Sequence, residues 1–161
     1  MIKFVKGDIL LSSAEAIAHG VAPNDDFKQG LALSLRERWP AMYKDFRHFC
    51  KTSHPKEGSL WSWKGAGSAM IINLFTQEHP PTQGGTPGRA QVSYVNSTLK
   101  ELVKEIENQK VKSVAITKLA TGVGGLPWTE VKPLIEHHLS ALGIPVYVYE
   151  EFHKDQKATE A

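Results

Sequence analysis

Short apolar runs typical of β-strands alternate along the chain with longer segments whose apolar residues recur every three or four positions. The strand-like runs, in chain order, are 2–5, 15–19, 60–63, 69–75, 113–119 and 144–149. The helix-like segments are 31–39, 42–50, 92–106 and 128–142. Because helices that connect buried strands must cover the faces of a sheet, this order predicts an α/β fold with a layered sheet. Glycines in the short connection at 64–67 predict a β-hairpin, so we expect the sheet to be mixed.

The composition of the chain is that of one folded domain. It has 161 residues, of which 41% are hydrophobic and 22% charged, and such values argue against disorder. Its 19 Lys and Arg against 17 Asp and Glu leave a net charge of +2, so we expect no strong footprint for duplex nucleic acid. No run approaches the ~18 apolar residues of a membrane span, and the chain opens in strand-like sequence rather than a signal peptide. We expect a cytoplasmic monomer with no membrane contact, in which residues 1–150 form the domain and 151–161 a frayed tail.

A glycine-rich stretch, residues 121–126, separates an apolar strand-like run from a helix-like segment that opens near Trp128. Gly122, Gly124 and Gly125 allow the backbone to approach an anion closely and to point its N–H groups at it. A tight strand-to-helix connection, with glycines needed only for steric reasons, accounts for the pattern equally well. The stretch is not a P-loop, because no lysine and hydroxyl residue follow its last glycine, and it is not the dinucleotide-binding fingerprint.

Residues suited to ligand binding also follow other strand-like runs. Asp8 comes directly after the first run, where open α/β sheets bind ligands, or it caps its own turn. His19 ends the second run and leads into a polar loop, 24–30, at a predicted helix start. The alternative is a buried structural histidine ahead of an ordinary capped helix. Phe75 ends the run 69–75 and can either stack on a ligand ring or belong to the core.

Taken together, these segments resemble the macrodomain family of ADP-ribose-binding proteins. The resemblance extends from the first strand-like run to the last. Within the family, the chain is most similar to the group of ADP-ribose-1''-phosphate phosphatases and terminal ADP-ribose glycohydrolases. The resemblance is carried by Val5-Lys6-Gly7-Asp8-Ile9, by His19 with Asn24 and Gly30-Leu31-Ala32, by Asn73-Leu74-Phe75-Thr76, and by Gly122-Val123-Gly124-Gly125-Leu126-Pro127-Trp128. It implies a three-layer α/β/α macrodomain with a mixed central sheet.

The resemblance also implies a role for each matching residue. Asp8 would accept a hydrogen bond from the adenine amine beside Ile9, and the glycine-rich stretch would hold the diphosphate through its backbone amides. The loop 24–31 and Phe75 would border the distal ribose, and His19 would be the catalytic residue. The full set of implied substrate-binding residues is Asp8, Ile9, Asn24, Gln29, Gly30, Leu31, Phe75, Thr76, Gln77, Thr121, Gly122, Val123, Gly124, Gly125 and Leu126.

Two departures from the family pattern bear on the reaction. Glycohydrolases that work through a lysine adduct hold that lysine where this chain has Gln77, and their acidic partner where it has Gly124 or Gly125. An amide nitrogen is not a nucleophilic amine. The implied hydrolysis of ADP-ribose-1''-phosphate or of an ADP-ribosyl linkage therefore proceeds by water attack without an adduct. The resemblance implies no cofactor and no metal, and His137 and His138, adjacent on a predicted helix, cannot both face one ion.

Three classes of function remain open at this point: a hydrolase, a reader that binds ADP-ribose without chemistry, and a domain that binds another nucleotide or an RNA end. The neutral residues at both catalytic positions favour the reader. His19 favours the hydrolase, because a histidine with an ordinary pKa near ~6.5 can relay a proton. The roles of several residues near the implied ligand also stay open, namely Lys28, Glu78, His79 and Arg89.

Overall fold

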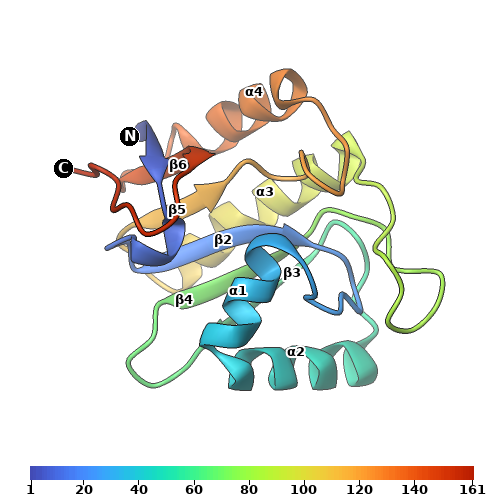
Figure 1. Cartoon of the computed structure of the whole chain (residues 1–161). Coiled ribbons are helices and arrows are strands. Elements are labelled where there is room, and N and C mark those ends of the chain that lie inside the picture. Colours follow the sequence, from blue (N-terminus) through green and yellow to red (C-terminus); the bar gives the residue numbers. More distant parts are fainter.

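The computed structural model describes all residues, 1–161, and is built around one six-stranded sheet (Figure 1). Its strands are β1 (Ile2–Gly7), β2 (Ala16–Val21), β3 (Leu60–Lys64), β4 (Met70–Phe75), β5 (Val114–Thr117) and β6 (Val146–Phe152). They lie in the spatial order β1-β6-β5-β2-β4-β3, and every neighbouring pair is parallel except β3 and β4. The predicted hairpin and mixed sheet are therefore confirmed.

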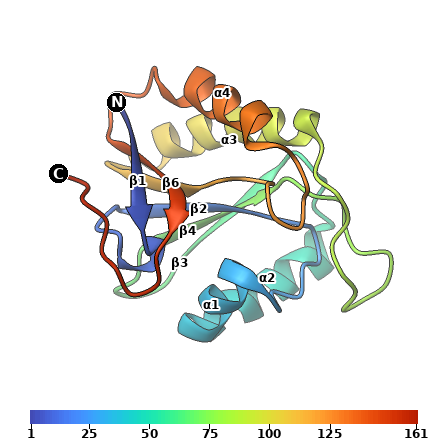
Figure 2. The same ribbon diagram turned by 45° about the horizontal axis from the view of Figure 1, so that its top comes forward.

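Helices cover both faces of the sheet, which makes three layers (Figure 2). The helices are α1 (Gly30–Arg38) and α2 (Pro40–Ser53) on one face, α3 (Val92–Asn108) and α4 (Trp128–Leu139) on the other, and a 3-10 helix, η1 (Ile9–Leu11), after β1. Pro40 suits the first turn of α2, where its missing N–H leaves no helical bond unmade. None of the helices combines the length and the apolar character that crossing a bilayer requires.

The alternation of side chains along β4 divides the core between the two faces of the sheet. All residues of β4 are buried: Ile72 and Leu74 pack towards α3 and α4, whereas Ile71 and Phe75 pack towards α1 and α2. β4 pairs in parallel with β2, which in turn pairs in parallel with β5. Because parallel strands end at the same edge of a sheet, the loops that follow β2, β4 and β5 gather there, on the right of Figure 1.

The segment after β6 packs along β1 and η1 and does not fit the expectation of a frayed tail. The Asp8 N–H donates to the Gln156 carbonyl (2.7 Å), and Ala158 is buried. The Glu160 carboxylate accepts hydrogen bonds from the hydroxyls of Ser12 (2.6 Å) and Tyr149 (2.5 Å). The segment is polar in composition, but its polar groups find partners on the domain, which composition alone does not reveal.

Replacing Glu160 by alanine should lower the free energy of unfolding by about 1–3 kcal/mol. The change leaves the hydroxyls of Ser12 and Tyr149 and the Ser13 N–H (3.1 Å from Glu160) without their acceptor. Denaturant unfolding measures the effect. Glu136→Ala, at an exposed carboxylate on α4, is the control, and its expected change lies within about 0.5 kcal/mol. Equal stability of the two variants would mean that the segment after β6 does not hold to the domain.

Candidate functional site

A cavity of about 290 Å³ opens at the carboxyl edge of the sheet. Its walls come from the end of β2, the loop before α1 with the first turn of that helix, the segment after β4, and the end of β5 with the glycine-rich stretch. We call it the ligand cavity. Its lining residues are His19, Gly20, Asp25, Asp26, Lys28, Gln29, Gly30, Leu31, Ala32, Gln77, Gly85, Pro87, Thr117, Lys118, Ala120, Gly122, Val123 and Gly124.

The ligand cavity brings together predicted site residues that lie far apart in the sequence. These are His19, Gln29, Gly30, Leu31, Gln77, Gly122, Val123 and Gly124. α1 begins at Gly30, so its first turn and the glycine-rich stretch line the same opening. Backbone N–H groups at a helix start and in a glycine turn both favour negative charge. The arrangement therefore suits a ligand that carries phosphate.

The glycines of the 121–126 stretch are required for different reasons. No atom lies within 4 Å of the point where a Cβ on Gly122 would stand, so this residue leaves open space in the cavity wall. A Cβ on Gly124 would stand 2.7 Å from the Ala120 carbonyl oxygen, which makes that glycine a packing requirement. Gly125 has a φ of +77°, a conformation that side chains rarely adopt. Gly122 is therefore the glycine whose small size matters for a ligand.

The other residues predicted for the diphosphate lie outside the ligand cavity. The Thr121 hydroxyl donates to the Lys118 carbonyl (2.9 Å) and closes a turn. Leu126 packs against the core beneath α3 and α4. Gly125 lies next to Arg89, whose Nη2 is 3.5 Å from the point where a Cβ on Gly125 would stand. Arg89 is exposed and forms no ion pair, so a free cation stands beside the glycine-rich stretch.

His19, at the end of β2, is 3% exposed, and its protonation follows from its neighbours. The side-chain amide of Asn73 donates to the Trp61 carbonyl (3.3 Å), which leaves Asn73 Oδ1 to accept from His19 Nε2 (2.7 Å). Nε2 therefore carries the proton, and Nδ1, which has no partner in the protein, keeps a free lone pair. Burial lowers the pKa of His19 from 6.5 to about 4, only partly opposed by the bond to Asn73. The ring is therefore neutral near pH 7.

Phe75 and Thr76 lie in the core, contrary to the expectation that they border a ligand. Phe75 is fully buried and packs against Phe46 of α2, with 6.0 Å between the ring centroids. Thr76 is also fully buried. Its hydroxyl has no hydrogen-bond partner and lies 2.6 Å from the point where a Cβ on Gly20 would stand. Because β4 has a strand on either side and helices on both faces, the side chains at its end are enclosed.

Asp8, Ile9 and Asn24 are likewise outside the ligand cavity. The carboxylate oxygens of Asp8 accept from the N–H groups of Leu10 and Asp155, each at 3.0 Å. Asp8 thus caps η1 and holds the segment after β6, and the turn-capping interpretation fits it better than a bond to adenine. Ile9 belongs to the core under α1 and α2, and Asn24 lines a neighbouring cavity beside α2.

Two charged residues complete the walls of the ligand cavity: Lys118, which the sequence analysis did not select, and Asp25, which lies in the predicted ribose-binding loop 24–31. Lys118 follows β5, and its Nζ lies 5.4 Å from the centre of the Trp128 ring. Asp25 accepts from the N–H groups of Ala22 (3.1 Å) and Phe27 (2.9 Å), and burial raises the pKa of its carboxyl. The place of Lys118, directly after an apolar strand, is the signal that could have identified it.

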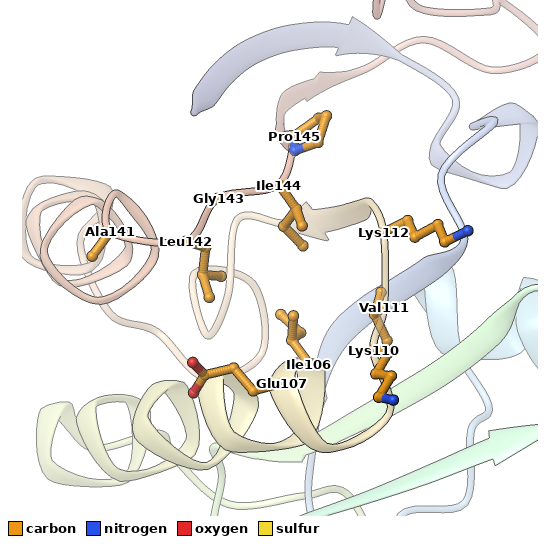
Figure 3. Close-up of a pocket in the computed structure, with 10 residues that line it drawn as sticks. All are labelled: Ile106, Glu107, Lys110, Val111, Lys112, Ala141, Leu142, Gly143, Ile144 and Pro145. Carbon is orange, nitrogen blue, oxygen red and sulfur yellow. The ribbon is translucent and has the colours of Figure 1, made fainter.

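A second cavity, of about 440 Å³, lies at the opposite edge of the sheet, before β5 and β6 (Figure 3). Ile106 and Ile144 point towards each other across it, and Gly143 forms part of its rim. It is remote from the glycine-rich stretch and from His19. Nowhere in the chain do three His, Cys, Asp or Glu side chains gather in a way that could hold a metal ion.

The fold and the ligand cavity define a three-layer α/β/α domain with a ligand-sized opening at the carboxyl edge of its sheet. Residues 27–135 match the Macro domain family, and the chain belongs to this family. The macrodomain predicted from the sequence motifs is therefore confirmed.

Two macrodomain proteins, from Thermus aquaticus and Mycobacterium tuberculosis, resemble this chain over most of its length. It is 32% identical over 151 residues to the DNA ADP-ribosyl glycohydrolase of Thermus aquaticus. The matched residues make up 93% of this chain and 41% of that protein. The solved macrodomain of Thermus aquaticus DarG superposes with a TM-score of 0.82 at 32% identity, covering 93% of this chain and 98% of that one. The solved macrodomain of Mycobacterium tuberculosis DarG superposes with a TM-score of 0.83 at 25% identity, and the match covers 92% of this chain and 97% of that one. The chain thus spans less than half of the curated relative.

Proposed function

We propose that this macrodomain binds ADP-ribose and hydrolyses an ADP-ribosyl linkage, with ADP-ribosylated DNA as its substrate. The observation that carries the proposal is the free space at the Cβ position of Gly122, in a cavity that the first turn of α1 also lines. A volume of about 290 Å³ suits the diphosphate and the distal ribose rather than the whole ligand. The similarity to a DNA ADP-ribosyl glycohydrolase supports DNA over a free phosphate ester or a protein as the carrier.

The charges around the ligand cavity support one orientation of the ligand. Lys118 in the wall and Arg89 beside Gly125 supply positive charge on the side of the glycine-rich stretch. The diphosphate therefore belongs on that side, held by backbone N–H groups and these cations. The opposite side, from Asp25 to Gly30, offers the carboxyl groups of Asp25 and Asp26 to the hydroxyls of the distal ribose, and the Gly84 carbonyl holds its one cation, Lys28.

Hydrolysis at this site proceeds without a covalent adduct. Gln77 stands in the cavity wall with its side-chain amide donating to the Gly88 carbonyl (3.1 Å), and an amide cannot act as the nucleophile. A water molecule attacks the anomeric carbon of the distal ribose, and a new C–O bond forms as the bond to the DNA carrier breaks. The free Nδ1 of His19 takes the water proton and passes it to the departing group. The glycine-rich stretch and the cations hold the ligand in place.

A reader that binds ADP-ribose without turnover is the second candidate function. Gln77, at the place of the adduct-forming lysine, and the neutral Gly124 and Gly125 favour it. Hydrolysis and reading share the same ligand, so affinity for ADP-ribose alone does not separate them. Turnover does.

Calorimetric titration with ADP-ribose should give a dissociation constant in the micromolar range, roughly −8 kcal/mol. A parallel activity panel contains an ADP-ribosylated DNA oligonucleotide, ADP-ribose-1''-phosphate and an ADP-ribosylated protein. We expect release of ADP-ribose from the DNA, and borohydride should trap no adduct. Binding without turnover of any substrate would leave the reader, and absence of binding would indicate a ligand other than ADP-ribose.

A further inference from the structure

A larger cavity, of about 650 Å³, adjoins the ligand cavity on the side of α2. It lies between α2 and residues 80–84, and we call it the α2 groove. Both cavities have Asp25 and Asp26 in their walls. At their border Lys28 donates a hydrogen bond to the Gly84 carbonyl, which links the loop before α1 to the loop after β4. A molecule whose distal ribose lies near Asp25 therefore has the α2 groove directly beyond that ribose.

One face of α2 presents positively charged and histidine side chains to the α2 groove. Arg47 and Lys51 are four residues apart and so lie on one face of α2, His54 follows as the residue that ends the helix, and all three are exposed. None of them forms an ion pair with a carboxylate, and His48 adds a further ring to the wall. From Arg47 to Lys51 the helix rises by about 6 Å, which suits two neighbouring phosphates.

The acidic groups that face the α2 groove are already engaged within the protein. Asp26 Oδ1 accepts from the Tyr43 hydroxyl at 2.8 Å. Both carboxylate oxygens of Asp25 accept backbone N–H groups. The loop opposite α2 contributes prolines, glycine and small polar residues and no charge. The two carboxylates stand at the border with the ligand cavity, whereas Arg47 and Lys51 lie along α2 without an ion-pair partner. The positive charge of the groove therefore lies on its α2 side, where it complements a phosphate backbone.

We propose that the α2 groove binds the phosphates of the single DNA strand whose ADP-ribosyl group lies in the ligand cavity. This rests on the proposed function and on the orientation that it gives the distal ribose. The base attached to that ribose leaves the ligand cavity at Asp25 and Asp26, where the α2 groove begins. A base carried into such a cavity must be unpaired, so the strand is single. The rings of His48 and His54 can stack on neighbouring bases.

The double variant Arg47→Gln/Lys51→Gln tests this assignment. Fluorescence anisotropy follows its binding to an ADP-ribosylated single-stranded oligonucleotide over a range of salt concentrations. Affinity should fall at least about tenfold at low salt. The slope of log affinity against log salt should flatten by about 1.4, because each phosphate contact with a single strand contributes about 0.7. Calorimetric affinity for free ADP-ribose should stay unchanged, because neither residue lines the ligand cavity.

Lys44→Gln/Lys56→Gln is the matched control, since it removes the same charge from exposed lysines outside the α2 groove. We expect it to bind the oligonucleotide like the wild type. Equal losses in the two double variants, or no loss in Arg47→Gln/Lys51→Gln, would overturn the assignment. A loss for an ADP-ribosylated peptide but not for the oligonucleotide would assign the groove to a protein carrier instead. Failure of the wild type to bind free ADP-ribose would contradict the proposed function itself.

Discussion

Replacing Gly122 by leucine should abolish ADP-ribose binding while the domain stays folded. No atom lies within 4 Å of its Cβ position and its φ is not left-handed, so the backbone accepts a side chain there. The leucine side chain then occupies the cavity wall against which we place the diphosphate. We expect affinity to fall at least about 100-fold, or about 2.8 kcal/mol. Calorimetry measures this loss, and the free energy of unfolding should change by less than about 1 kcal/mol.

Gly143→Leu is the matched control for this variant. Its Cβ position is equally free of atoms within 4 Å, but it stands at the rim of the cavity on the opposite edge of the sheet (Figure 3). It should bind ADP-ribose like the wild type. Gly124→Leu does not serve, because its Cβ would collide with the Ala120 carbonyl and unfold the loop. ADP-ribose binding by a folded Gly122→Leu protein would show that the diphosphate lies elsewhere.

The layers of this fold were predictable because the spacing of hydrophobic residues depends on whether one or both faces of an element are buried. The run 69–75 is apolar almost throughout, and the corresponding β4 is enclosed on both faces. The segment 92–106 has apolar residues on one side only, and the corresponding α3 covers the sheet with that side. The segment after β6 was not predictable in this way, because its attachment depends on hydrogen bonds such as that from Tyr149 to Glu160.

The candidate site was predictable in its place along the chain but not in the direction of each side chain. Gly122 and Gln29 follow a strand and precede a helix, and the loops that carry them do meet in the ligand cavity. Phe75 also ends a strand, yet the alternation along β4 turns it towards α2. Asp8 stands at a strand end as well, but its own turn and the segment after β6 use its carboxylate. Lys118 was missed because the predicted strand, 113–119, includes it, whereas β5 ends at Thr117 and leaves Lys118 in the wall of the ligand cavity.

His19 should make the stability of the domain depend on pH. Its pKa in the unfolded chain is the ordinary 6.5, whereas burial holds it at about 4 in the folded domain. Between these values the unfolded state binds more protons, so stability is lost as the pH falls. At 1.36 kcal/mol per pKa unit, the loss between pH 7.5 and pH 4.5 is about 2.5 kcal/mol. Above about pH 7 the ring is neutral in both states and contributes no further pH dependence.

His19→Gln removes this titration and keeps an amide that can donate to Asn73. Denaturant unfolding should show that, from pH 7.5 to pH 4.5, the free energy of unfolding falls by about 2.5 kcal/mol more in the wild type than in the variant. The same variant should hydrolyse ADP-ribosylated DNA about 10²–10⁴-fold more slowly. Its affinity for ADP-ribose should change much less, because Nδ1 acts on the reacting end of the ligand. The pH effect with unchanged turnover would make His19 a structural residue, and hydroxyls of the substrate would then have to activate the attacking water.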